Sequence, residues 1–326
     1  MNYIDKISLI ITTYNRSENI IKIIKLINKQ LNLHNKIEIL ICDSNSKDKL
    51  KILNHIKNYN SLDIRYVNLK KNNQAYKRNI GAKVSKGEYI IFLDDDCFPE
   101  SNFLFNFYKK LKLKRKRDIY CGTVQYIKKS NIKNLIKFRD DRSIKYKNSS
   151  KKILVKNFVT MNMGLNKKNF SNYENFFDKR FNFYGFEDFE LAYRLEKRGY
   201  NIELISSKIF HKDFRSFKIW LKRFQYMGEF GIHDICKINI NAARKSIFYK
   251  IYKNRFLISF FKIPKIIIIL NYLEKLIIFI EGKMLFYLPL LYKGGMFISY
   301  IKGLYIKFNK KKEFKSYKNS LTNWYE

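Results

Sequence analysis

The sequence predicts an α/β fold: a mostly parallel sheet with helices on both faces, followed by a helical C-terminal extension. Over the first hundred residues, short runs rich in Ile, Leu and Val alternate with segments whose apolar residues recur at helical spacing. Strands that alternate with helices pair in parallel, because each helix returns the chain to the start of the next strand. From residue 235 onwards the alternation stops and helical spacing continues.

The elements of the first half follow one another regularly. We expect strands at residues 7–13, 37–42, 64–67 and 89–93, each closed by polar or turn-forming residues. Between them we expect a helix capped by Ser17, one over residues 47–58, and one over 74–86 that Gly87 ends. The first helix shows the spacing most clearly, with apolar residues at Ile20, Ile23, Ile24, Ile27 and Leu31.

The composition is strongly basic. The 326 residues include 66 Lys and Arg against 28 Asp and Glu, which gives a net charge of +38. Such an excess attracts polyanions, but Lys, Asn, Ile, Tyr and Phe are abundant throughout the chain, so charge alone identifies no partner. A nucleic-acid-binding protein would show a recognisable binding module, and none is present, so we expect no nucleic acid partner.

The cysteines and the N-terminus indicate where the protein resides. The four cysteines are scattered without a C-x-x-C pair, which is typical of reduced thiols and not of a disulfide framework or a zinc site. The first residues have the pattern of a strand and not of a signal peptide. We therefore expect a cytoplasmic protein.

Polar side chains follow three of the expected strands. Thr12 and Tyr14 lie at the end of the first, Asp43 follows the second, and an acidic triplet at residues 94–96 follows the fourth. In open α/β sheets, ligands bind outside the carboxyl ends of the strands, so this topology gathers these residues at one ligand site. Three adjacent carboxylates repel one another and favour a hard divalent cation such as Mg²⁺ or Mn²⁺. The alternative is a solvated acidic loop.

Seven segments, in order, resemble family 2 glycosyltransferases, which are nucleotide-sugar enzymes of the GT-A fold. The resemblance covers about the first 215 residues. The matching segments are IITTYNR (10–16), ICDSNSKD (41–48), KRNIGAKVSKGEYIIFLDDD (77–96), NMGLNKKNF (162–170), FFDKRF (176–181), GFEDFELAYRL (185–195) and His211.

The resemblance implies a role for each matching residue. Thr12 and Tyr14 would line the base pocket, and Asp43 would hydrogen-bond the uracil edge. The remaining donor contacts would be Arg78 near the nucleotide, and Asp94 and Asp95 near the ribose and the donor sugar. Asp96, which closes the D-x-D motif, and His211 would bind a Mn²⁺ or Mg²⁺ ion beneath the diphosphate. Asp188 would be the general base, with Glu187 beside it at the acceptor.

The residues themselves leave an alternative for the acidic pair. Glu187 and Asp188 open an amphipathic helix that Gly199 ends, and acidic residues in a first turn are favoured by the helix dipole alone. The order of the surrounding motifs favours catalysis by Asp188. One base acting in a direct displacement would invert the anomeric centre. The sequence departs from the family pattern at two positions, with Thr12 in place of the usual Pro and Phe186 in place of a small Gly. A bulky Phe beside the acidic pair would reshape the acceptor pocket, so the resemblance does not specify the acceptor.

The chain after residue 234 has a different character. It holds 18 Lys and Arg against 4 Asp and Glu, with dense Ile, Leu, Phe and Tyr. Between Pro264 and Pro289 a helix would gather its polar residues on a narrow stripe and leave a broad apolar face. That face would lie on an anionic membrane surface, or pack on the catalytic domain or on a second subunit. The sequence leaves the oligomeric state open.

Taken with these observations, the resemblance implies a metal-dependent, inverting hexosyltransferase. We expect residues 1–234 to form the GT-A domain, with 1–115 as the nucleotide half and 116–234 as the acceptor half, and 235–326 to form the helical tail. The donor would be a UDP-sugar and the acceptor a hydroxyl of a glycan or lipid-linked molecule in surface polysaccharide synthesis, at the inner face of the plasma membrane. The alternatives are a catalytically silent membrane scaffold, or a sugar-nucleotide pyrophosphorylase, although no Gly-rich loop follows the first strand.

Overall fold

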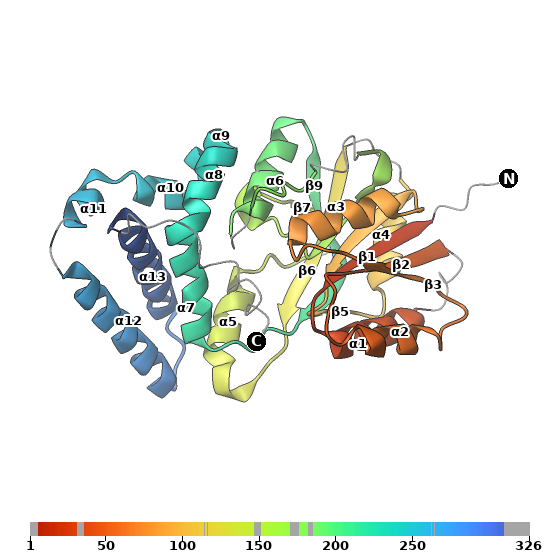
Figure 1. Cartoon of the computed structure of the whole chain (residues 1–326), viewed down its shortest axis with the longest axis horizontal. Helices are drawn as coiled ribbons and strands as arrows, with labels where there is room; N and C mark the ends of the chain where they lie inside the picture. The colour runs from red at the N-terminus through yellow and green to blue at the C-terminus, as the bar shows by residue number, and fades with distance from the viewer. Residues whose placement is uncertain are drawn as a thin grey trace.

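The computed structural model describes residues 6–30, 36–113, 115, 117–146, 151–169, 176–181, 185–261, 263 and 265–309. Within these residues a twisted sheet carries helices on both faces, and a group of C-terminal helices packs against one end (Figure 1). The predicted α/β fold and helical extension are confirmed. Leu31, expected in the first helix, lies outside the described residues.

The described strands form one sheet in the order β3-β2-β1-β4-β8-β6-β9-β5, with β7 paired to β9. The first four strands are parallel, as predicted, whereas β8 runs antiparallel to both β4 and β6. The strands are β1 (Ile7–Thr13), β2 (Ile37–Asp43), β3 (Asp63–Asn68), β4 (Tyr89–Asp94), β5 (Cys97–Pro99), β6 (Asp118–Tyr126), β7 (Lys151–Lys152), β8 (Asn162–Asn166) and β9 (Asn201–His211).

The central strands are nearly continuous buried runs, and successive residues point to opposite faces, so both faces of the sheet pack against helices. On β1, Ile7, Leu9 and Ile11 pack against one helical layer, and Ile10 packs against the other. The first layer contains α1 (Ser17–Asn28), α2 (Lys49–Ile56) and α4 (Phe103–Leu111). The second contains α3 (Gln74–Val84) and α6 (Glu187–Lys197).

A glycine sets the close approach of α3 to the sheet. A Cβ atom at Gly81 would lie 2.5 Å from the side chain of Ile10 and 2.9 Å from Sγ of Cys42. Only glycine therefore lets α3 lie this close to β1 and β2. The approach carries the polar side chains of the N-terminal half of α3 over the carboxyl ends of these strands.

The C-terminal helices form a third core together with α5 (Lys133–Arg142). They are α7 (Phe217–Tyr226), α8 (Ile232–Ile238), α9 (Ile240–Lys245), α10 (Ile247–Tyr252), α11 (Arg255–Phe260), α12 (Ile266–Lys283) and α13 (Pro289–Asn309). A π-helical turn, Met227–Gly231, joins α7 to α8. The backbone of α13 crosses this turn closely: a Cβ at Gly228, within the turn, would lie 2.2 Å from the carbonyl oxygen of Tyr300 on α13.

This packing crosses the predicted division of the chain. Helix α8 continues through residue 234, and the third core takes residues from both sides of it. Among the described helices, none combines the length and the apolar character needed to cross a membrane.

Candidate active site at the carboxyl edge of the sheet

The strand register brings the predicted nucleotide residues together. Thr12 is paired with Asp94 across β1 and β4, and Thr13 is paired with Asp43 across β1 and β2. Tyr14 follows directly after β1 and is half-buried. Residues far apart in sequence thus share one edge, because parallel strands end on the same side of the sheet.

Asp43 is fixed by a network of hydrogen bonds. Its carboxylate is fully buried and accepts a hydrogen bond of 2.5 Å from the Ser46 hydroxyl. The hydroxyl of Tyr66, on β3, donates to the other carboxylate oxygen, Oδ2. Burial and this hydrogen bond raise the pKa of Tyr66 well above its usual range, so Tyr66 stays a donor. The network holds the side chain of Asp43 in a fixed position at the carboxyl edge of the sheet.

Helix α3 supplies two donors to Asp94. Nη2 of Arg78 lies 2.7 Å from Oδ1 of Asp94, and Nε2 of Gln74 lies 3.1 Å from the same oxygen. Gln74 also donates to the hydroxyl of Thr12 at 2.5 Å. The Arg78 guanidinium lies over the ring of Phe177, 5.3 Å from its centroid. Asp94 and Thr12 are therefore held in one network with α3.

Asp96 and His211 meet although they are far apart in sequence. Nε2 of His211 lies 3.3 Å from Oδ1 of Asp96. The pairing of β5 with β9 causes this contact, because Cys97 lies directly opposite His211 in that ladder. Burial alone would raise the pKa of Asp96, but His211 and Arg16 outweigh burial and hold this pKa well below its usual range.

The donor atoms around Asp96 fit a divalent cation. Ligand atoms of Asp96, Cys97 and His211 all lie within 4.8 Å of one another, and all three residues are buried. Nδ1 of His211 is also buried and has no hydrogen-bond partner among the described residues. Burial raises the pKa of the Cys97 thiol well above its usual range, which leaves the carboxylate and the imidazole as the available ligands. An oxygen and a nitrogen ligand suit Mn²⁺ or Mg²⁺.

A guanidinium bridges the second and third aspartates. Nη1 of Arg16 lies 2.8 Å from Oδ1 of Asp95 and 2.9 Å from Oδ2 of Asp96. The hydroxyl of Thr13 donates to Asp95 at 2.8 Å. Burial nevertheless raises the pKa of Asp95 to about 6. Arg16 thus offsets part of the repulsion within the triplet.

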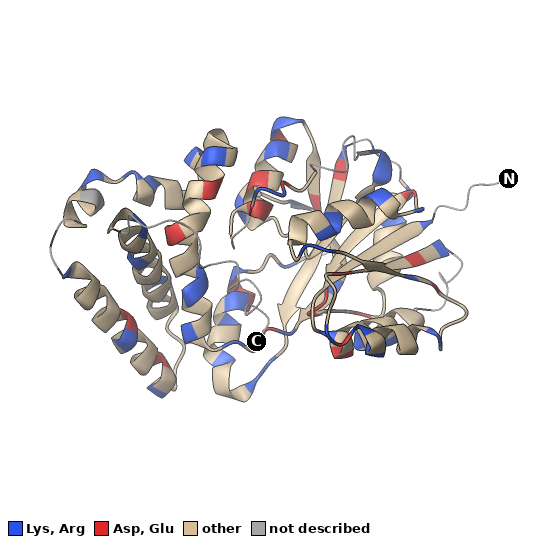
Figure 2. Cartoon of the chain, viewed as in Figure 1, with Lys and Arg blue, Asp and Glu red and all other residues tan. Residues whose placement is uncertain are grey.

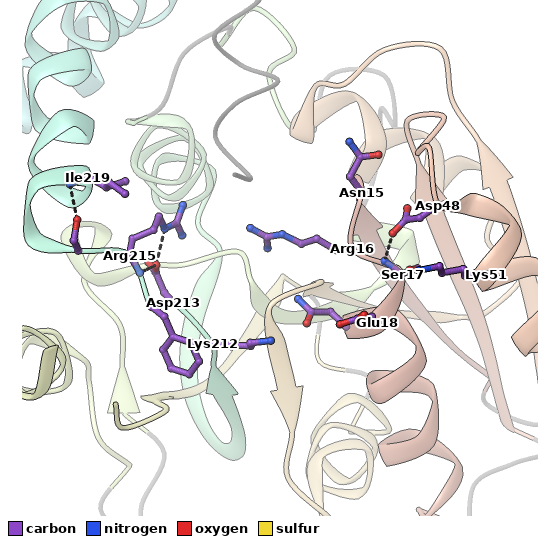
Figure 3. Close-up of a pocket in the computed structure, with 13 residues that line it drawn as sticks. Asn15, Arg16, Ser17, Glu18, Asp48, Lys51, Lys212, Asp213, Arg215 and Ile219 are labelled. Atoms are coloured by element: carbon purple, nitrogen blue, oxygen red, sulfur yellow. Dashed lines mark hydrogen bonds and ion pairs between the residues drawn. The ribbon is translucent and has the colours of Figure 1, made fainter. Parts of the chain in front are cut away.

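A cavity of about 570 Å³ opens beside this bridge. Arg16 extends into it from the start of α1, and Lys212 and Arg215 face it from the segment after β9 (Figure 3). That segment is fixed by Asp213, whose carboxylate pairs with Arg215 at 2.5 Å and with Arg139 at 3.2 Å. The cavity therefore places positive side chains next to the Asp96–His211 pair.

The predicted catalytic pair lies at the start of α6. The hydroxyl of Thr160 donates to Oδ1 of Asp188 at 2.6 Å, and the Thr160 backbone N–H donates to Oδ2 at 3.3 Å. Glu187 accepts a hydrogen bond of 3.0 Å from the backbone N–H of Gly185. Thr160 is buried, so it fixes the direction of the Asp188 carboxylate.

Burial and proximity raise the pKa values of both acids. Burial, followed by the negative charge of Asp188, raises the pKa of Glu187 to about 7. Burial also raises the pKa of Asp188, while Arg78 and Thr160 oppose the rise. Arg78 interacts electrostatically with Asp94 and with both acids, so it links the carboxyl edge of the sheet to the predicted catalytic pair.

Phe186 has a backbone conformation that favours glycine. Its φ is 72°, in the left-handed region, and its side chain is buried. The ring packs edge-to-face on Phe248 of α10, with centroids 5.8 Å apart. On the same helix as the catalytic pair, Glu190 accepts a hydrogen bond of 3.1 Å from the amide of Asn239. The C-terminal helices are thus joined to α6 at two points.

Several residues at this site were not predicted from the sequence. Arg16 lies in the quoted segment IITTYNR, and its place after β1 was a usable signal. Gln74 and Tyr66 lie on a predicted helix and a predicted strand. The sequence gives no signal that Gln74 would bond Asp94 or that Tyr66 would bond Asp43. Thr160 lies in a stretch without a clear pattern, so only its hydrogen bond to Asp188 identifies it.

An α/β sheet whose carboxyl edge joins an acidic triplet to a distant histidine is the arrangement that the resemblance to GT-A glycosyltransferases implies. The sequence model described as "Glycosyl transferase family 2" matches residues 8–173. The chain belongs to glycosyltransferase family 2.

Curated relatives match over part of their length. The chain is 37% identical over 105 residues to the poly(ribitol-phosphate) beta-N-acetylglucosaminyltransferase TarP of Staphylococcus aureus, covering 32% of each protein. It is 36% identical over 96 residues to the UDP-Glc:alpha-D-GlcNAc-diphosphoundecaprenol beta-1,3-glucosyltransferase WfaP of Escherichia coli, covering 28% of this chain and 36% of that protein. The matches thus span about a third of these relatives.

Solved structures agree in fold. Residues 1–349 of S. aureus TarS in complex with UDP superpose with a TM-score of 0.52 at 14% identity, covering 95% of this chain and 94% of that one. The same protein with UDP-GlcNAc gives 0.52 at 13% identity, covering 92% and 91%. The similarity includes the C-terminal helices, and it establishes the GT-A fold.

Proposed function

We propose that this chain transfers a hexose from a UDP-sugar to a hydroxyl group, with inversion at the anomeric carbon and with Mn²⁺ or Mg²⁺ as cofactor. The observation that carries the proposal is the contact between Asp96 and His211, beside a cavity into which Arg16 extends. The names of TarP and WfaP support an N-acetylhexosamine or hexose as the sugar.

In this proposal the carboxyl edge holds the donor. Thr12 and Tyr14 line the base pocket, and Asp43 accepts a hydrogen bond from the uracil. Arg78, Asp94 and Asp95 orient the ribose and the donor sugar.

The leaving group is stabilised at the other end of this edge. Asp96 and His211 are the protein ligands of the divalent cation, which supplies positive charge to the departing diphosphate when it is bound. Arg16 and Lys212 line the adjacent cavity and add further positive charge.

The acceptor is activated by Asp188. Its carboxylate takes the proton from the attacking hydroxyl while Thr160 holds its orientation. Glu187 lies beside it and contacts the acceptor. A single base on the side opposite the leaving group produces inversion, because the hydroxyl attacks the anomeric carbon directly.

We further propose that the acceptor is a glycan or a lipid-linked precursor of a surface polysaccharide, used at the inner face of the plasma membrane. The name of WfaP specifies an undecaprenol-linked acceptor, and that of TarP a poly(ribitol phosphate). We retain residues 1–234 as the proposed transferase domain and 235–326 as its tail, although the two share a core.

A panel of nucleotide sugars tests the donor. Each is added with Mn²⁺, with Mg²⁺ or with EDTA, and both thermal stabilisation and donor hydrolysis are measured. We expect the largest response from a UDP-sugar with Mn²⁺. A stronger response to GDP- or CDP-sugars, or an equal response in EDTA, would contradict the proposal.

A further inference from the structure

Helix α12 is oriented with its polar side inwards. Its two acidic residues are half-buried and bind α13: Glu274 accepts from the Ser299 hydroxyl at 2.7 Å and pairs with Lys302 at 2.5 Å, and Glu281 accepts from Tyr292 at 3.3 Å. The acidic side of α12 therefore faces the protein.

The opposite side of α12 is apolar and uncovered. Its exposed residues recur every three or four positions, which places them on one side of the helix. We call this set the outer face of α12: Ile268, Ile269, Tyr272, Leu273, Leu276, Phe279 and Ile280. Their side chains are 36% to 65% exposed, although such residues are usually buried. Helix α12 lies at the edge of the molecule farthest from the sheet, with α13 between it and α7 (Figure 1). Its first two turns carry no charged residue, whereas its second half carries both signs of charge (Figure 2).

The exposed charges of the C-terminal helices are positive. Between residues 240 and 309, the described residues include nine exposed Lys and Arg and no exposed Asp or Glu. Three of them, Lys265, Lys275 and Lys283, lie at the ends and in the middle of α12. The others are Arg244, Lys245, Lys250, Lys253, Arg255 and Lys293.

We infer that the outer face of α12 docks on an anionic phospholipid bilayer, with the helix lying in the interface between headgroups and acyl chains. The apolar side chains enter the bilayer, and the lysines contact the lipid phosphates. A second copy of the chain fits less well, because a two-fold interface would bring the same uncompensated positive charges face to face. The inference depends on the proposed function in one respect only: docking would bring the enzyme close to a lipid-linked acceptor.

Vesicle binding by the full chain tests the inference. The protein is sedimented with phosphatidylcholine vesicles, with and without phosphatidylglycerol. We expect binding only to the anionic vesicles, and binding that weakens as salt is added. The triple variant Ile268→Ser, Tyr272→Ser, Phe279→Ser should bind at least tenfold more weakly.

Two matched controls test whether binding depends on the outer face of α12 or only on the number of exposed apolar or basic residues in the chain. The triple variant Leu50→Ser, Phe105→Ser, Leu154→Ser removes comparably exposed apolar residues elsewhere and should bind like the wild type. Replacing Lys265, Lys275 and Lys283 by Gln should abolish the preference for anionic lipid. The same change at the exposed Lys57, Lys70 and Lys109 should preserve it.

Three results would overturn the inference. The first is equal binding to both kinds of vesicle, and the second is equal weakening by the two serine variants. The third is a concentration-dependent dimer that the α12 variant dissociates while vesicle binding stays unchanged, since a second copy would then cover the face. Transfer to a water-soluble acceptor without vesicles should be the same in the α12 variant and the wild type. A chain that binds vesicles but transfers no sugar would disprove the proposed function and leave this inference intact.

A spectroscopic measurement gives an independent readout. Phe279→Trp places an indole on the outer face of α12, where Phe279 is 64% exposed. Anionic vesicles should shift its emission to the blue, and brominated lipid should quench it. An unshifted, unquenched signal in the presence of bound vesicles would place another surface at the membrane.

Discussion

The imidazole of His211 lies 3.3 Å from the carboxylate of Asp96, at the point where β5 and β9 pair. One residue closes the acidic triplet after β4, and the other ends the last long strand of the sheet. Their contact places a carboxylate and an imidazole together at the end of the acidic triplet, where we propose that the divalent cation binds.

Removal of either ligand should abolish cation-dependent donor binding. With Mn²⁺ present, UDP should raise the melting temperature of the wild type. Neither Asp96→Ala nor His211→Ala should show this rise, because each variant leaves one protein ligand. Cys97→Ser should keep it, since the buried thiol stays protonated and binds a hard cation weakly. Loss of the rise in Cys97→Ser alone would mean that the thiol is a ligand.

Replacement of the proposed base should remove transfer and keep binding. Asp188→Asn conserves shape and the hydrogen bond from Thr160 but cannot accept a proton. We expect kcat to fall by about 10²- to 10⁴-fold, with UDP affinity within a factor of about two of the wild type. Calorimetric titration with UDP is the control. Turnover near the wild-type rate would show that Asp188 is not the base.

Thr160 should control the acid limb of the rate profile. Its hydrogen bond lowers the pKa of Asp188, which burial raises. Thr160→Val removes this bond, so Asp188 becomes protonated at higher pH and the acid limb should move to higher pH. The loss of rate should thus be larger at pH 6 than at pH 8. Thr160→Ser keeps the hydroxyl and should retain the wild-type profile. This control shows whether the effect of Thr160→Val comes from the lost hydrogen bond or from misfolding.

Glu187 should make the folded state less stable as pH rises. Its pKa is raised from 4.5 to about 7, so between these values the folded chain binds more protons than the unfolded chain. The contribution of Glu187 to the free energy of unfolding therefore falls as pH rises through this window. Glu187→Gln should be more stable than the wild type at pH 8, by on the order of 1 kcal/mol, and similar to it at pH 4. Urea unfolding at both pH values measures the difference, and an equal effect at both would contradict the raised pKa.

Phe186 should couple the catalytic helix to the C-terminal helices. Phe186→Gly relieves the left-handed backbone but removes a buried ring, so we expect a net loss of about 2 kcal/mol of stability. A double-mutant cycle with Phe248→Ala should give a coupling of about 0.5 to 1.5 kcal/mol. Additive effects would show that the two rings do not stabilise one another.

The sequence determined the elements of the first half and the edge where the site lies. Strand and helix periodicity predicted β1 to β4, and parallel pairing then required Thr12, Asp43 and Asp94 to share one edge. It also singled out Asp96, Asp188 and His211, because their motifs occur in the order of the family. These are local or topological properties, which hydrophobic pattern and chain direction are enough to specify.

Only the tertiary structure decided how side chains meet across distant elements. The β5–β9 ladder placed His211 beside Asp96, and the stretch before β8 brought Thr160 to Asp188. Likewise, the side chain of Glu274 on α12 points towards α13 because Ser299 and Lys302 of α13 bind its carboxylate. An amphipathic pattern shows that a helix has two sides, but which side is buried depends on the partners that pack against it.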